Sequence, residues 1–239
     1  MSREDGRANN HLREITAKVG IIKNAKGSAF FKIGKTAAYA AVYGPRELHP
    51  KFLQNPKTGV LRCYYSMMPF SGVGERIRPG PNRRAKEISL VTEKALLPVV
   101  DLSDYPNAVV DVFIEVPQAD AGTRCAGICA AAMALADAGL RMKDIPVSIA
   151  CGLVNGEVVA DLTYNEEASE GAVDLPICIL PRTGEITLLQ MDGKISKEKL
   201  MEAIELGKKV SHDLAQNLRN ALLEKYIDLD NNHNKEDTK

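Results

Sequence analysis

The segment Gly122–Gly139 constrains the fold more than any other part of this sequence. It reads GTRCAGICAAAMALADAG and consists mainly of Ala, Gly, Cys and other apolar residues. A helix that is apolar on nearly all sides has to be buried, and its small side chains let it pack closely against a sheet. We therefore predict a central buried helix in this segment, covered by β-strands.

β-rich runs precede and follow this segment. Ala108–Val116 alternates most clearly, with Val110, Val112 and Ile114 on one face and Asp, Phe and Glu on the other. The other predicted strands are Ile15–Lys23, Ser28–Gly34, Thr36–Tyr43, Val60–Met68, Val147–Val154, Glu157–Leu162, Leu175–Leu180 and Glu185–Met191.

Two further helices are expected. Apolar residues recur at helical spacing within Arg83–Val100, and Ser196 can cap a long amphipathic helix near the C-terminus. This order of strands and helices is typical of an α+β or mixed α/β fold, and it differs from a regular βαβ array. Because the sequence contains no linker and no internal repeat, we predict one domain over residues 1–227. A polar, disordered tail is expected at 228–239.

The composition excludes several classes of protein. No run of about 20 apolar residues is present to span a bilayer, and the polar start, MSREDGRANNHLRE, is unlike a secretory signal. The five Cys residues include no CxxC pair, and most lie in apolar runs. Buried, reduced thiols are typical of intracellular proteins, so we expect a cytoplasmic location.

The charges balance in sum but not in distribution. The chain has 31 Lys and Arg and 31 Asp and Glu, which gives a net charge of zero. The stretch Arg46–Lys86 contains nine basic and two acidic residues, whereas Glu157–Asp192 contains eight acidic and one basic. Such asymmetry favours a nucleic-acid partner at the basic stretch. Two solvated surfaces of opposite sign would give the same counts.

The segment Gln118–Gly127, QADAGTRCAG, is the best candidate for an anion site. It joins a predicted strand to the buried helix, and a helix N-terminus presents free backbone N–H groups and a positive dipole. Arg124 adds a two-pronged donor and Thr123 a hydroxyl. A capped helix with a surface Arg is the alternative, and the residues alone leave both interpretations open.

Two other segments supply opposite charges. The basic segment RIRPGPNRRAKE (Arg76–Glu87) fits a phosphodiester backbone. The acidic segment DLTYNEEASEGAVD (Asp161–Asp174) has carboxylates that can hold a divalent metal or act as a general acid. Read alone, the basic segment is equally typical of a solvated loop, and the acidic segment is more typical of one. Together with the anion site they form the components of phosphoryl transfer on nucleic acid, which depends on positioning and charge neutralisation.

Six motifs, in order along the chain, resemble the RNase PH family of phosphorolytic exoribonucleases, in the form found in archaeal exosomes. They cover about Arg3–Lys225 and read REDGRANNHLREI, KGSAFFKIGKTAAYAAVYGP, RPGPNRRAKEIS, DVFIEVPQADAGTR, ALADAG and EITLLQMDG. The resemblance implies a single-domain RNase PH fold, like ribosomal protein S5 domain 2.

The resemblance also implies an activity and partners. The expected protein is a phosphate-dependent 3′→5′ exoribonuclease that releases nucleoside diphosphates, and its reverse reaction adds 3′ tails. Three such subunits would alternate with three inactive RNase PH-like homologues in a hexameric ring, which carries a cap of RNA-binding subunits. The 3′ end of single-stranded RNA would enter the channel of this ring. Mg²⁺ or Mn²⁺ is the implied cofactor, and inorganic phosphate is the co-substrate.

The matching motifs assign roles to individual residues. Gly122, Thr123, Arg124 and Cys125 correspond to the phosphate-binding motif, and Arg124 also counts among the catalytic residues. RNA contacts are implied for Arg83 and Arg84 near the 3′ end and for Arg62, Lys51 and Lys57 at the neck of the channel. The catalytic and metal-binding carboxylates are implied to be Glu167, as general acid, and Asp174.

The first carboxylate departs from the family pattern. The family usually has Asp in this position, six residues before the second Asp, whereas Glu167 lies seven residues before Asp174. Tight positioning makes such a shift capable of costing roughly 100-fold in rate. One alternative is therefore an RNA-binding scaffold subunit of the same ring that has lost most catalysis. A stand-alone enzyme that trims tRNA ends is a third possibility, which the exosome-like motifs disfavour.

Overall fold

The computed structural model describes residue 3 and residues 5–73, 76–80 and 82–236. Its elements are β1 (Ile15–Val19), β2 (Gly27–Ile33), β3 (Thr36–Glu47), the 3-10 helix η1 (Lys51–Leu53), β4 (Val60–Met67), α1 (Arg83–Leu96), β5 (Ala108–Gln118), α2 (Thr123–Asp137), β6 (Val147–Val154), β7 (Glu157–Ala160), α3 (Tyr164–Glu167), β8 (Val173–Ile179), β9 (Ile186–Leu189) and α4 (Lys197–Glu236). This order confirms the predicted α+β arrangement.

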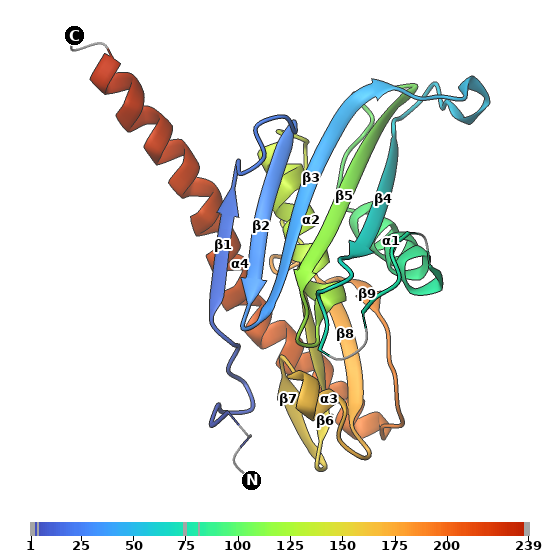
Figure 1. Ribbon diagram of the computed structural model, residues 1–239, viewed down its shortest axis with the longest axis vertical. Coiled ribbons are helices and arrows are strands. Elements are labelled where there is room, and N and C mark those ends of the chain that lie inside the picture. The colour runs from blue at the N-terminus through green and yellow to red at the C-terminus, as the bar shows by residue number, and fades with distance from the viewer. Residues whose placement is uncertain (1–2, 4, 74–75, 81, 237–239) are drawn as a thin grey trace.

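Two sheets form the framework (Figure 1). The first has the strand order β1-β2-β3-β5-β4, in which β4 and β5 are parallel and the other neighbours antiparallel. The second has the order β7-β6-β8-β9 and is antiparallel throughout. Helix α2 contacts β2, β3 and β5 of the first sheet and β6 of the second. It therefore joins the two halves of the core.

Helix α2 confirms the predicted central buried helix. Within it only Arg124, Ala136 and Asp137 are not buried. The first sheet approaches the end of α2 so closely that a Cβ built on Gly27 of β2 would lie 2.2 Å from the backbone nitrogen of Ala138. Arg124 is thus the one incompletely buried side chain in the first three turns of α2.

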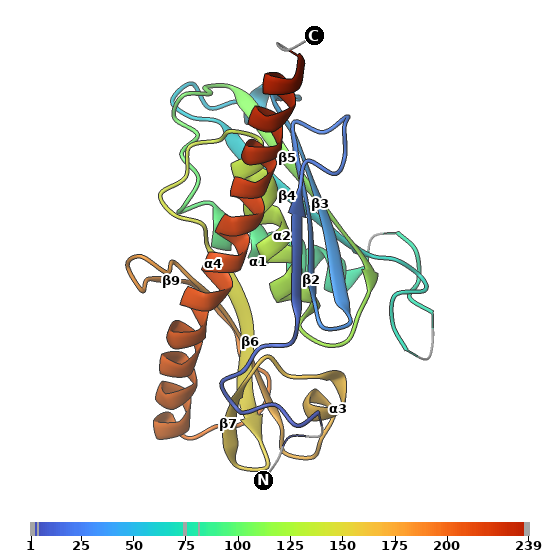
Figure 2. The same ribbon diagram turned by 90° about the vertical axis from the view of Figure 1, so that its left-hand side faces the viewer.

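Helix α4 packs on the second sheet and reaches β1 of the first (Figure 2). Lys225 forms an ion pair with Asp137 at the end of α2. The helix continues to Glu236, so it includes part of the segment for which we expected a tail. Residues 237–239 lie outside the described residues. Disorder of the tail in solution and a single domain over residues 1–227 stay predictions.

One helix was not expected from the sequence. The acidic segment, which we interpreted as a loop, contains the short helix α3. Thr163 caps it: its hydroxyl accepts a hydrogen bond from the Glu166 N–H, and the Glu166 carboxylate accepts one from the Thr163 N–H. The Thr-x-x-Glu spacing of this capping box is visible in the sequence. Its consequence is that Glu166 and Glu167 point in different directions.

Candidate active site

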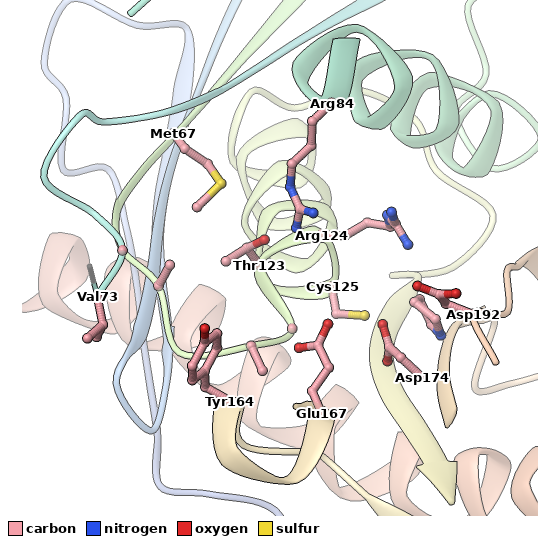
Figure 3. Close-up of a pocket in the computed structure, with 15 residues that line it drawn as sticks. Met67, Val73, Arg84, Thr123, Arg124, Cys125, Tyr164, Glu167, Asp174 and Asp192 are labelled. Carbon is pink, nitrogen blue, oxygen red and sulfur yellow. The ribbon is translucent and has the colours of Figure 1, made fainter. Parts of the chain in front are cut away.

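A pocket of about 290 Å³ lies at the N-terminus of α2 (Figure 3). Side chains from α1, α2, α3 and β8 line it, together with the segments that follow β4, β5 and β9. The predicted site residues that it brings together are Arg84, Gly122, Thr123, Arg124, Cys125, Glu167 and Asp174. The three charged segments of the sequence therefore meet in one place.

Hydrogen bonds from buried side chains fix the backbone of the turn 120–122, which leads into α2. Ala121 and Gly122 have φ angles of +57° and +61°, a region that is unfavourable for alanine. The Thr36 hydroxyl donates to the Ala121 carbonyl at 2.6 Å and accepts from the Asp120 N–H at 2.8 Å. Arg13 Nη1 donates to the Asp120 carbonyl at 2.6 Å. These contacts fix the direction of the first N–H groups of α2, which have no partner within the helix.

Two arginines bring positive charge to the pocket. Arg124 is the second residue of α2, and its side chain is only 18% exposed. Arg84 is the second residue of α1, and its side chain extends from that helix towards Thr123 and Arg124 (Figure 3). Both arginines lower the pKa of Asp174, although burial and nearby carboxylates outweigh them. Arginine suits phosphate because its donors form a planar fork.

Cys125 lines the pocket without being a nucleophile. Burial raises the pKa of its thiol well above the ordinary value, so the thiol stays protonated at neutral pH. All five Cys residues are buried and free, as the sequence predicted. The group that Cys125 can offer to an anion is therefore its backbone N–H at the start of α2.

Three carboxylates face the other side of the pocket. Glu167 is the last residue of α3, Asp174 lies on β8, and Asp192 follows β9. Burial raises the pKa of Asp174 to about 6, and the charges of Glu167 and Asp192 contribute to this rise. Asp192 is held beside Asp174 because the two backbones exchange N–H···O bonds of 3.0 and 2.9 Å. Asp192 was missed in the sequence, although it lies in the motif EITLLQMDG.

The neighbouring Glu166 has a structural role. Its buried carboxylate accepts hydrogen bonds from Arg3 Nε at 2.7 Å and Arg3 Nη2 at 2.6 Å. Burial opposes ionisation, but these bonds and the one from Thr163 lower the pKa of Glu166. In the turn between α3 and β8, the Ser169 N–H donates to the Glu166 carbonyl at 3.2 Å. Glu167, at the end of α3, lines the same pocket as Asp174 (Figure 3).

The carboxylates fit one kind of metal site. Within the described part of the chain, no three His, Cys, Asp or Glu side chains are close enough to form a protein-only metal site. Mg²⁺ usually binds through one or two carboxylates and completes its shell with water and substrate phosphates. Glu167 and Asp174 fit that requirement, since both face a pocket that also suits phosphate.

The remaining predicted RNA contacts lie outside this pocket. Arg83 is exposed on α1 beside Arg84 but does not line the pocket. Arg62 lies five residues before Met67 on β4, about 17 Å away along the strand. It donates to the buried Asp111 at 2.8 Å. Lys51 and Lys57 lie between β3 and β4, at the end of the sheet far from the start of α2 (Figure 1). Their contact with RNA stays a prediction.

Two family models match the chain. The model for domain 1 of the 3′ exoribonuclease family matches residues 11–141, and the model for domain 2 matches residues 144–210. The chain belongs to the 3′ exoribonuclease family, RNase PH. This confirms the resemblance found in the six motifs.

Similar proteins share this family. Exosome complex component Rrp41 of Thermococcus gammatolerans is 53% identical over 225 residues, which cover 94% of this chain and 90% of that protein. The protein of the same name from Pyrococcus abyssi is 52% identical, with the same coverage. The crystal structure of rice Rrp46 superposes with a TM-score of 0.83 at 26% identity and covers 92% of this chain and 100% of that one.

A further structure agrees in fold. The Archaeoglobus fulgidus exosome with RNA bound to the active site matches with a TM-score of 0.76 at 22% identity, covering 90% of this chain and 92% of that one. The RNase PH fold expected from the motifs is thus confirmed. In the described part of the chain, no helix combines the length and apolarity needed to cross a membrane.

Proposed function

We propose that this chain is the catalytic subunit of an exosome-type ring and degrades RNA from its 3′ end by phosphorolysis. The observation that supports this best is the convergence of Arg124, the N-terminus of α2, Arg84 and the carboxylates of Glu167 and Asp174 on one pocket. Membership of the 3′ exoribonuclease family and the identity of over 50% to exosome components named Rrp41 favour the same function.

Each group has a task in this reaction. Inorganic phosphate binds the first N–H groups of α2, the Thr123 hydroxyl and Arg124, while Arg84 binds the RNA backbone. A phosphate oxygen forms a bond to phosphorus of the last phosphodiester, and the bond from that phosphorus to the 3′ oxygen of the preceding nucleotide breaks. Glu167 donates a proton to this leaving oxygen. The products are a nucleoside diphosphate and an RNA shortened by one nucleotide, and reversal of the step extends a 3′ end.

Glu167 and Asp174 would hold Mg²⁺ or Mn²⁺, which supplies charge neutralisation at the transferring phosphoryl group. Independently of the ion, the two arginines and the helix dipole concentrate positive charge where negative charge accumulates. The position of Glu167 opposite Asp174 supports an enzyme over the scaffold alternative, despite the inserted residue.

The ring partner and location belong to the same proposal. An inactive RNase PH-like homologue would alternate with this chain in a hexamer, and RNA-binding cap subunits would cover one side. Single-stranded RNA would enter through the channel, where Arg83, Arg62, Lys51 and Lys57 contact its backbone. Five buried, unpaired Cys residues favour a cytoplasmic location.

The direct test is an assay of the full-length chain, alone and assembled with its homologous partner. A 3′-tailed RNA is incubated with Mg²⁺, with and without inorganic phosphate. Nucleoside diphosphates that form only with phosphate are expected. If the assembled ring forms no such products, the catalytic function is wrong and the RNA-binding scaffold is the remaining alternative.

A matched pair of variants tests the assignment of Arg124. Arg124→Ala is expected to lower kcat/KM for phosphate roughly 100-fold or more. Arg141→Ala is the control, because Arg141 is 66% exposed and pairs with Asp101 and Asp104 away from the pocket. Equal activity of the two variants would remove Arg124 from the phosphate site.

A further inference from the structure

The guanidinium of Arg124 is held at one end and unpaired at the other. Its Nη2 donates to Glu87 Oε1 at 3.3 Å. Its Nε is buried and has no hydrogen-bond partner among the described residues. A buried N–H without a partner is unfavourable unless a ligand or water completes it. An anion bound in the pocket that Arg124 lines would supply the acceptor that this Nε lacks.

Glu87 is itself fixed by a second donor. Gln190 Nε2 donates to the same Oε1 atom at 3.1 Å. Glu87 comes from α1, Arg124 from α2, and Gln190 follows β9, so one carboxylate oxygen joins three elements around the pocket. Glu87 also follows Arg84 by three residues, which places both side chains on the same face of α1. Helix α1 thus presents a cation to the pocket and, one turn later, an anion to Arg124.

The energetics of this contact favour a role in binding over a role in folding. The Glu87 side chain is 46% exposed, and exposed ion pairs contribute little to stability. The guanidinium, however, lies beside the positive end of α2 and shares the pocket with Arg84, so both repel it. A carboxylate on its outer side offsets that repulsion and restricts a flexible side chain. Preorganised donors bind an anion more tightly than mobile ones.

We propose that Glu87 is a positioning residue for phosphate: it holds Arg124 by Nη2 so that the Nε side of the guanidinium faces the phosphate that attacks the RNA. This inference rests on the proposed phosphorolytic function. Glu87 acts only through Arg124 and does not touch phosphate or RNA in this role.

The test compares KM for inorganic phosphate with KM for RNA in the full-length chain, assembled as for the activity assay. Glu87→Ala raises the phosphate KM roughly tenfold, because Arg124 loses its preorganised position. The RNA KM and the melting temperature stay near those of the wild type. Glu87→Gln retains an oxygen acceptor for both donors and recovers most of the phosphate KM.

Two controls separate positioning from a general charge effect. Glu170→Ala removes an exposed carboxylate of the acidic segment Asp161–Asp174 that does not line the pocket, and it leaves the phosphate KM unchanged. In an Arg124→Ala background, Glu87→Ala has no further effect on the phosphate KM, since its route of action is already lost. An effect of Glu170→Ala equal to that of Glu87→Ala, or additive effects in the double variant, would overturn the proposal.

The outcomes also separate this inference from the proposed function. If the wild-type ring forms no nucleoside diphosphates, the phosphorolytic function is wrong. If the wild-type ring is active and Glu87→Ala has an unchanged or lower phosphate KM, only the role of Glu87 is wrong.

Discussion

Asp174 lies partly buried opposite Glu167, and burial together with that neighbouring charge raises the pKa of Asp174 to about 6. The two residues come from β8 and the end of α3, and both line the same pocket. Ionisation of Asp174 in this pocket therefore costs free energy, and a bound cation would remove that cost.

The raised pKa predicts how stability depends on pH in the absence of divalent ions. The ordinary pKa of Asp is 3.8, so well below that pH the carboxyl is protonated in both folded and unfolded chains and costs nothing. Between about pH 4 and pH 6 the unfolded chain has lost this proton and the folded chain still holds it, so stability falls across this window and the full penalty is reached above pH 6. Asp174→Asn removes the penalty and should stabilise the fold by on the order of 1–2 kcal/mol above pH 6, after allowance for solvent screening.

Thermal unfolding of Asp174→Asn and wild type from pH 3 to pH 8, with a chelator present, checks this. The difference in melting temperature should be near zero at pH 3, should grow between about pH 4 and pH 6, and should level off above pH 6. A difference that is constant across this range would show that the carboxyl does not titrate as described.

The adjacent residues Glu166 and Glu167 should have opposite phenotypes. Glu166→Ala removes the carboxylate that neutralises the buried Arg3 and should destabilise the fold by roughly 2–4 kcal/mol. Glu167→Ala should leave the melting temperature nearly unchanged and lower phosphorolysis by roughly 100-fold or more. Melting curves and single-turnover rates of both variants measure this, and an exchange of the two phenotypes would reverse the roles assigned here.

Arg84 and Arg83 should contribute unequally to RNA binding near the reacting phosphate. Arg84 lines the pocket, whereas Arg83 is exposed outside it. Arg84→Ala should lower kcat/KM for RNA by roughly 10–100-fold, and Arg83→Ala by less than about threefold at moderate salt. Initial rates at several salt concentrations compare the two, and equal losses would contradict the unequal placement.

Thr36 should matter to the phosphate site although it is remote in sequence. Thr36→Val removes the hydroxyl that bonds Asp120 and Ala121, and should cost about 1–3 kcal/mol in stability and raise the phosphate KM. Thr92→Val is the matched control, because Thr92 is equally buried but its hydroxyl has no hydrogen-bond partner among the described residues. The control should be neutral or slightly stabilised, and a similar loss in both variants would disprove a specific role for Thr36.

Local patterns in the sequence predicted much of this architecture. The small residues of α2 required a buried helix because no polar face was available, and the alternation in β5 required a strand with one buried face. The turn before α2 predicted an anion site from the sequence alone. The N-terminus of a helix has free N–H donors whatever the rest of the fold, and Arg124 lies beside them. The six motifs indicated the family for the same reason, because local backbone geometry and local chemistry determine their residues and their order along the chain.

The tertiary structure decided which of the marked residues work together. Glu166 and Glu167 are adjacent in sequence, and the ion pair between Glu166 and the distant, buried Arg3 turns one inward and leaves the other in the pocket. Asp192 joins Asp174 through strand pairing, and Glu87 joins Arg124 across two helices. Contacts between residues this far apart depend on how sheets and helices pack, which residue spacing along the chain does not encode.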